Sequence, residues 1–236
     1  MSTLLLRLAA PLQSWGLDAK FDRRSTERVP TKSGVIGLIA AALGRRRNEC
    51  IKDLQNLRFG VRVDREGVLV RDYHTAKSET AAYVTQRYYL ADAVFLAGLE
   101  GDEELLSDIE HALKHPAFPL FLGRRSCPPE GRVSLGVRFR KSLLEALQEE
   151  PWLISDWLKK KEAAQVRLRI VIDSEDGKYA YFQRDIPVSF SQIHRKFGFR
   201  QVYEPSPLVI SNPYGWTAIS QRATDHDPMK ELEGGS

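Results

Sequence analysis

The sequence Gly123-Arg124-Arg125-Ser126 combines three groups that can bind a phosphate. A glycine lets the backbone come close to a ligand, two guanidinium groups can bracket phosphate oxygens, and the Ser126 hydroxyl can donate a further hydrogen bond. Two surface arginines in a turn would have the same sequence. Because another basic segment lies near the N-terminus, we favour the phosphate-binding interpretation.

That N-terminal segment is a basic loop followed by a predicted helix. The loop carries Lys20, Arg23, Arg24 and Arg28, and Pro30-Thr31-Lys32-Ser33-Gly34 opens the helix. Unpaired backbone N–H groups and the helix dipole make a helix N-terminus a ready anion site. Lys32 and Ser33 therefore either position a phosphate or simply begin the helix. Nucleotide hydrolysis is disfavoured, because no GxxxxGK[ST] motif occurs.

A third set of candidates lies between residues 71 and 89. Arg87 precedes Tyr88 and Tyr89. An arginine can pair with phosphate and stack on a splayed base, and the tyrosines provide further stacking surfaces. The tyrosines could equally be ordinary strand residues. His74, in Arg71-Asp72-Tyr73-His74-Thr75, is the best candidate for a general acid or base of RNA cleavage. A lone histidine in a polar loop is more often exposed or structural.

Other catalytic and metal-binding patterns are missing from the sequence. No HExxH motif, Ser-His-Asp set or Cys-His arrangement can be assembled. Cys50 and Cys127 lie far apart and outside any CxxC spacing, so we predict free thiols in a reducing cytoplasm. No segment is apolar for long enough to span a membrane, and the first twelve residues are a poor secretion signal. We expect no metal, no cofactor and no membrane contact.

The distribution of charge supports a polyanionic partner more than its total does. The net charge is +4, from 35 basic and 31 acidic residues. Acidic residues gather at 101–110 and 145–150, which leaves basic clusters at 20–32, 45–47 and 124–125. An electrostatic binding surface depends on such patches and not on the sum.

The elements that must position these residues can be predicted from hydrophobic periodicity. Strands are expected at 4–8, 58–64, 68–72, 87–99 and 133–139, and helices at 34–43 and 102–114. The polar residues 73–86 are predicted to form an exposed arm. This order, β-α-β, arm, β-α-β, is typical of a ferredoxin-like (RRM-like) α+β sheet. We predict three regions: residues 1–140 as this domain, 141–225 as a small β-rich region and 226–236 as a disordered tail.

Four motifs together resemble a known family. They are Leu6-Arg7-Leu8-Ala9-Ala10-Pro11-Leu12-Gln13-Ser14-Trp15-Gly16, Pro30-Thr31-Lys32-Ser33-Gly34, Arg71-Asp72-Tyr73-His74-Thr75 and Leu122-Gly123-Arg124-Arg125-Ser126-Cys127-Pro128. In this order they resemble the CasD family, subunits of the type I-E CRISPR surveillance complex Cascade. The similarity covers residues 4 to about 128. Arg184-Asp185-Ile186-Pro187 also looks like the family's C-terminal segment.

The resemblance implies a ferredoxin-like domain of the RAMP superfamily, with a protruding β-hairpin "thumb" at about 66–88 and a small β-rich C-terminal region. It implies a non-catalytic role, holding the 5′ handle of CRISPR RNA beside a CasC-type backbone subunit and a CasA-type large subunit. Target DNA would be met only through the complex. The residues expected to contact RNA are Gln13, Trp15, Arg24, Arg28, Lys32, Ser33, Arg71, His74, Arg87, Arg124, Arg125 and Ser126.

Two alternatives stay open. The type I-C counterpart has a similar fold and cuts repeat RNA without metal, using Tyr, Lys and His residues; Tyr73, His74 and Lys77 are close in sequence here, but do not match that set position by position. Type I-E systems have a separate processing subunit, CasE, so we favour the binding role. A scaffold that binds only protein would lose no RNA affinity when Arg87 or Arg124 is removed.

Overall fold

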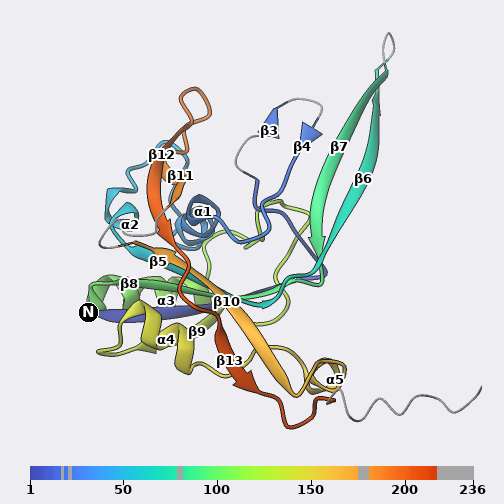
Figure 1. The fold of residues 1–236 in the computed structure, drawn as a ribbon. Coiled ribbons are helices and arrows are strands. Elements are labelled where there is room, and N and C mark those ends of the chain that lie inside the picture. Colours follow the sequence, from blue (N-terminus) through green and yellow to red (C-terminus); the bar gives the residue numbers. More distant parts are fainter. Residues whose placement is uncertain (17–18, 21–22, 79–81, 175–180, 217–236) are drawn as a thin grey trace, which may run out of the picture. The chain divides into compact units, whose positions relative to one another are not determined.

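The computed structural model describes residues 1–16, 19–20, 23–78, 82–174 and 181–216 (Figure 1). The chain divides into two compact units. Residues 1–153 and 168–208 form the larger unit, and the smaller one consists of residues 154–167 and the segment that begins at 209. The predicted mixture of helices and strands is confirmed. The predicted tail, 226–236, lies outside the described residues.

The larger unit is organised on an antiparallel sheet with the strand order β11-β12-β10-β5-β8-β1-β9. These strands are β1 (Ser2–Ala9), β5 (Arg58–Arg65), β8 (Val94–Gly101), β9 (Ser134–Arg138), β10 (Gln165–Asp173), β11 (Tyr181–Ser189) and β12 (Lys196–Tyr203). The strands β10 to β12 thus continue the sheet that the N-terminal half begins. The predicted boundary at residue 140 stays a prediction.

The core explains why β1 is apolar at consecutive positions. Leu4, Leu6 and Leu8 pack on one side of the sheet against α1 (Lys32–Ala42) and α3 (Glu103–Lys114), while Leu5 packs on the other side against α4 (Leu143–Glu149). A strand buried on both faces needs no alternation of polar residues. Two short helices complete the set, α2 (Lys52–Gln55) and, in the smaller unit, α5 (Asp156–Lys159). The predicted helices 34–43 and 102–114 are confirmed to within two residues at each end.

A second sheet carries the candidate binding residues. It consists of β2 (Leu12–Gln13), β3 (Ala19–Lys20), β4 (Arg23–Arg24), β6 (Val68–Lys77) and β7 (Ala82–Ala91). β6 pairs with β7 from Val68↔Ala91 to Lys77↔Ala82 and makes a long hairpin that projects from the larger unit (Figure 1). The other edge of β7 pairs with β2 and, in parallel, with β4. β13 (Leu208–Ser211) follows β12 in the chain, and all of it but Leu208 belongs to the smaller unit.

One predicted strand is wrong. Residues 87–99 were expected to form a single strand, but they are divided between β7 and β8, which belong to different sheets. Asp92 lies between them with a φ of 55°. An aspartate tolerates this left-handed conformation better than most residues, so a tight turn breaks a run whose composition is otherwise typical of one strand.

Candidate nucleic-acid interface

Three arginines lie on one face of β7 near the base of the β6–β7 hairpin, and we call them the arginine cluster: Arg24, Arg87 and Arg124. The parallel pairing of β4 with β7 puts Arg24 beside Arg87 and Arg23 beside Gln86. Arg124, which comes from the loop after α3, donates from Nη2 to the carbonyl oxygen of Arg24 at 2.9 Å. Three segments that are distant in sequence therefore bring their cations together.

Tyr89 of β7 supports this cluster, and Tyr88 supports Arg23 on the opposite face of the strand. The Arg124 guanidinium lies 4.5 Å from the ring centroid of Tyr89, and that of Arg23 lies 5.2 Å from the ring of Tyr88. Cations at such distances are attracted by the negative face of the ring. Tyr89 is only 5% exposed, so its ring holds Arg124 in place and is not an open surface for a base. Of the two predicted stacking residues, Tyr88 is the more accessible, being half-buried.

Two nitrogen atoms of the cluster are buried and have no hydrogen-bond partner among the described residues, Nε of Arg87 and Nη1 of Arg124. Leaving a buried donor unpaired costs about 1–3 kcal/mol, and more when the group is charged. Native proteins therefore pair nearly all such groups, and an exception calls for an explanation. A phosphate oxygen is the acceptor that guanidinium donors fit best.

The loop that presents Arg124 is held rigidly against the N-terminal segment. The Ser14 amide donates to the carbonyl of Leu122 at 3.1 Å, and the Leu122 amide donates to that of Cys127 at 2.7 Å. Gly123 has a φ of +85°, and a Cβ at this position would lie 1.6 Å from the Ser14 carbonyl oxygen. Only glycine fits so close an approach. The glycine that the sequence suggested for ligand contact instead brings two protein segments together.

Gln13 and Trp15 are buried and connect elements of the protein. The Gln13 amide donates to the carbonyls of Leu8, at 3.2 Å, and Ala93, at 2.7 Å, and its oxygen accepts from Trp15 Nε1 at 3.1 Å. The Trp15 ring lies under the first turn of α1, where a Cβ on Gly34 would come within 2.8 Å of it. A direct contact of either side chain with RNA would require this packing to open.

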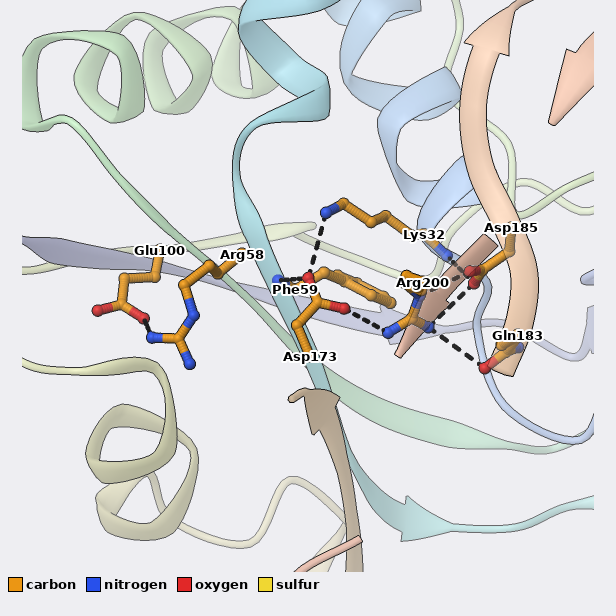
Figure 2. Close-up of polar contacts among 8 residues, drawn as sticks. All are labelled: Lys32, Arg58, Phe59, Glu100, Asp173, Gln183, Asp185 and Arg200. Atoms are coloured by element: carbon orange, nitrogen blue, oxygen red, sulfur yellow. Dashed lines mark hydrogen bonds and ion pairs between the residues drawn. The ribbon is translucent and has the colours of Figure 1, made fainter. Parts of the chain in front are cut away.

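The N-terminus of α1 is already occupied by a carboxylate (Figure 2). The Lys32 amide donates to Asp185 Oδ2 at 2.8 Å, and Lys32 Nζ pairs with Asp173 Oδ2 at 3.1 Å. The Thr31 hydroxyl accepts from the Gly34 amide at 3.2 Å, and Ser33 is buried. Asp185 is fully buried there. A phosphate that approached Lys32 and Ser33 would have to displace this acidic residue, so the structure does not bring these two candidates into the arginine cluster.

Arg200 completes this buried polar network. Its guanidinium donates to Asp173 Oδ1 at 2.6 Å and to both oxygens of Asp185, at 2.6 and 3.0 Å. Burial acts to lower the pKa of Arg200, but the two carboxylates outweigh it and raise the pKa above its ordinary value. The network joins β10, β11 and β12 to α1 and, through the Phe59 amide on Asp173, to β5. A separate pair in Figure 2, Arg58 with Glu100, links β5 to β8.

The other predicted residues are exposed and less concentrated. Arg28, Arg125 and Ser126 lie at the surface of their loops, and Arg71 lies opposite Tyr88 on β6. His74 Nδ1 is 3.3 Å from Asp72 Oδ2. Arg23 was noted in the basic loop but not in the predicted site. It directly precedes Arg24, the β4 partner of Arg87, and nothing in the sequence indicated this strand pairing.

The described residues contain no group of three or more His, Cys, Asp or Glu side chains that could hold a metal ion. No helix among them is long and apolar enough to cross a membrane. Chemically, the arginine cluster can bind an anion through fixed guanidinium donors, and the exposed cations around it can extend the contact along a polyanion.

Comparisons with known proteins identify the relatives of this chain. The model of the family described as CRISPR-associated protein (Cas_Cas5) matches residues 3–203. The CRISPR system Cascade subunit CasD of Escherichia coli (strain K12) is 37% identical over 161 residues, which cover 58% of this chain and 71% of that protein.

Two solved structures have a similar fold. One, described as a crystal structure of a Cas protein, is 42% identical with a TM-score of 0.69, covering 90% of this chain and 97% of that one. The other, a chain of a CRISPR RNA-guided surveillance complex, is 31% identical with a TM-score of 0.73, covering 91% of this chain and 93% of that one. This chain therefore belongs to the Cas5 family of CRISPR-associated proteins.

Proposed function

We propose that the chain is a non-catalytic subunit of a type I-E Cascade complex and that its arginine cluster binds phosphates in the 5′ handle of CRISPR RNA. The observation that carries the proposal is the pair of buried, unpartnered guanidinium nitrogens, Arg87 Nε and Arg124 Nη1. Arg87 pairs with Arg24 across the strands, Arg124 donates to the Arg24 carbonyl, and the Arg124 guanidinium lies over the Tyr89 ring. Membership of the Cas5 family and the likeness to CasD make RNA the most suitable polyanion.

The topology supports a ferredoxin-like RAMP domain as the platform. In the order β5-β8-β1-β9 all neighbours are antiparallel, α1 lies between β1 and β5 in the chain, and α3 lies between β8 and β9. This is the arrangement of two interleaved β-α-β units. In the proposal, the β6–β7 hairpin is the thumb of such a domain, and residues 141–225 are its C-terminal region.

The predicted residues take different roles in this proposal. Arg87 and Arg124 donate to phosphate oxygens, with Arg24 beside them. The exposed residues Arg28, Arg71, Arg125, Ser126 and His74 extend the contact over the surface of the hairpin and the neighbouring loops. Gln13, Trp15, Lys32 and Ser33 act indirectly, because their burial fixes the segments that carry the arginines.

The ribonuclease alternative has less support. Successive residues of a strand point to opposite faces of a sheet, so His74 projects from the face of β6 opposite to Tyr73 and Lys77. A general acid and base must reach the same ribose and phosphate. His74→Ala provides the test: repeat RNA is incubated with the chain in EDTA and run on a denaturing gel. We expect intact RNA with both proteins, whereas cleavage that the variant loses would make the chain a processing enzyme.

The proposed partners follow from the same family. A CasC-type backbone subunit and a CasA-type large subunit would flank the handle-binding surface, and target DNA would be read by base pairing with the guide. This subunit then needs to recognise only a constant RNA segment. Mutations in the arginine cluster should change how much guide is retained and leave the choice of target unchanged.

The decisive experiment measures guide content. Cascade is purified with the Arg124→Glu variant of this chain, and its RNA is extracted and quantified per complex. We expect a clear loss of guide RNA. Arg167→Glu is the matched control, because Arg167 is an exposed arginine of the smaller unit. A normal guide content in the Arg124→Glu complex would refute the assignment of the arginine cluster.

A further inference from the structure

The β11–β12 hairpin has two faces of opposite character. Its inner face carries Asp185 and Arg200, which are buried in the network with Lys32. Its outer face carries aromatic rings: Phe182 is 69% exposed and Phe199 is 63% exposed. Phe182 pairs with Gln201, and Gln201 lies two residues from Phe199, so both rings project from the same face.

The row of aromatic side chains continues toward the tip of the hairpin. Phe197 lies two residues before Phe199 on β12, and the Arg195 guanidinium lies 5.0 Å from the Phe197 ring centroid. Alternate residues of a strand are spaced by ~6.7 Å on one face. Exposed aromatic rings in a row are uncommon on a soluble surface and mark an interaction site.

Within residues 181–203 the exposed charges are all positive, and the carboxylate that follows them, Glu204, is paired with Arg169 and accepts from the Tyr181 hydroxyl. Between residues 181 and 203 the only acidic residue is Asp185, and it is buried against Arg200. Arg184, Arg195 and Lys196 are exposed. Although Arg195 is exposed, burial of part of its side chain, and after it the Arg47 guanidinium, lower the pKa of Arg195. Like charges whose neighbouring carboxylates are already paired with other residues fit a polyanionic ligand.

The edge of the sheet argues against a protein strand as the ligand. β11 is the last strand of its sheet, but Pro187 lies in it. Proline has no N–H group to donate to an added strand, and its presence on an edge opposes strand pairing. Aromatic rings with interspersed arginines are instead the features of surfaces that bind single-stranded nucleic acid, where bases stack and phosphates meet cations. A duplex would not expose its base faces to these rings.

We propose that the outer face of the β11–β12 hairpin is a second binding surface, for single-stranded nucleic acid, in which bases stack on Phe182 and Phe199 while Arg184 and Arg195 contact phosphates. Figure 1 draws this hairpin apart from the β6–β7 hairpin that bears the arginine cluster. The two surfaces would therefore hold different strands or different segments of one strand. Stacking on phenylalanine tolerates any base, so we expect little sequence preference.

The test uses fluorescence anisotropy with the full chain and labelled 12-residue strands of oligo-dT and oligo-U. Both strands are measured because stacking alone would not distinguish DNA from RNA. The chain carries Arg87→Glu and Arg124→Glu, so that the arginine cluster does not contribute. We expect dissociation constants of about 1–100 µM that rise with salt, the range of sequence-independent binding. The double variant Phe182→Ala/Phe199→Ala should weaken binding by tenfold or more.

Phe139→Ala is the matched control, because Phe139 is 61% exposed and lies outside the hairpin. Because Phe182 and Phe199 are exposed, their replacement should leave the thermal unfolding temperature unchanged. If the unfolding temperature does change, oligonucleotide binding is measured instead with the double variant Arg184→Glu/Arg195→Glu, which should also weaken it. The proposal is overturned if neither oligonucleotide binds at about 100 µM, or if the hairpin variants bind as well as the Phe139→Ala control.

A second measurement distinguishes failure of this proposal from failure of the handle-binding proposal. Handle RNA is measured with the hairpin variants in an otherwise unchanged chain, and we expect its affinity to persist. Loss of oligonucleotide binding in the Phe182→Ala/Phe199→Ala chain, together with normal handle binding, supports two surfaces. Loss of handle affinity by the same amount would mean that a single surface binds both, which contradicts the inference.

Discussion

Replacing Arg87 and Arg124 together by glutamine tests whether the two unpartnered nitrogens bind phosphates. Each phosphate contact on a single strand contributes about 0.7 to the slope of log affinity against log salt concentration, so two contribute about 1.4. A hydrogen bond to a charged group contributes about 1.5–3 kcal/mol, which is roughly tenfold to more than a hundredfold in affinity. Because both side chains lie beside Arg24, the two losses should not add fully.

The assay is a series of anisotropy titrations of handle RNA between about 50 and 200 mM salt. The control is Arg167→Gln, which removes an exposed arginine of the smaller unit and should change neither the slope nor the affinity. The slope separates lost phosphate contacts from altered packing, because packing changes affinity without releasing counterions. A double variant that binds more weakly with an unchanged slope would refute the phosphate assignment.

Three further predictions concern stability. Gly123→Ala should lower the thermal unfolding temperature much more than Gly131→Ala. Both glycines have a positive φ, which costs an alanine about 1–2 kcal/mol. An added Cβ would lie 1.6 Å from the Ser14 carbonyl oxygen at Gly123, but 3.8 Å from its nearest neighbour, Arg7 Nη1, at Gly131. Asp185→Ala should cost about 3–5 kcal/mol in urea denaturation, because it removes one of the two carboxylates that neutralise buried Arg200 and the acceptor of the Lys32 amide; a loss below about 1 kcal/mol would contradict that burial. Hydrogen bonding from Arg169 holds the pKa of Glu204 below its ordinary value. Its contribution to stability is therefore present above the ordinary pKa and is lost as pH falls through the lowered folded pKa, and Glu204→Gln should remove this part of the acid dependence of the unfolding temperature.

Local sequence was sufficient to single out the three arginines that the fold brings together. Arg24, Arg87 and Arg124 each stand in a segment whose composition is basic or aromatic, and the fold brings these segments together. The occupant of the α1 N-terminus could not be predicted in the same way. Asp185 lies 153 residues from Lys32 in the sequence, and only the pairing of β11 with β12 and the burial of Arg200 bring it there.

The position of carboxylates decides which cationic groups remain available for a polyanion. At α1, Asp185 and Asp173 neutralise Lys32 and Arg200, and the resulting network is buried, so it stabilises the fold and leaves little charge for a ligand. In the arginine cluster, Asp72 is the residue opposite Arg87, but its carboxylate lies near His74 at the surface. An exposed pair of this kind contributes little to the stability of the fold, and salt screens its attraction. Among the described residues, Arg87 Nε and Arg124 Nη1 consequently have no hydrogen-bond partner, which is the condition that the proposed phosphate contact requires.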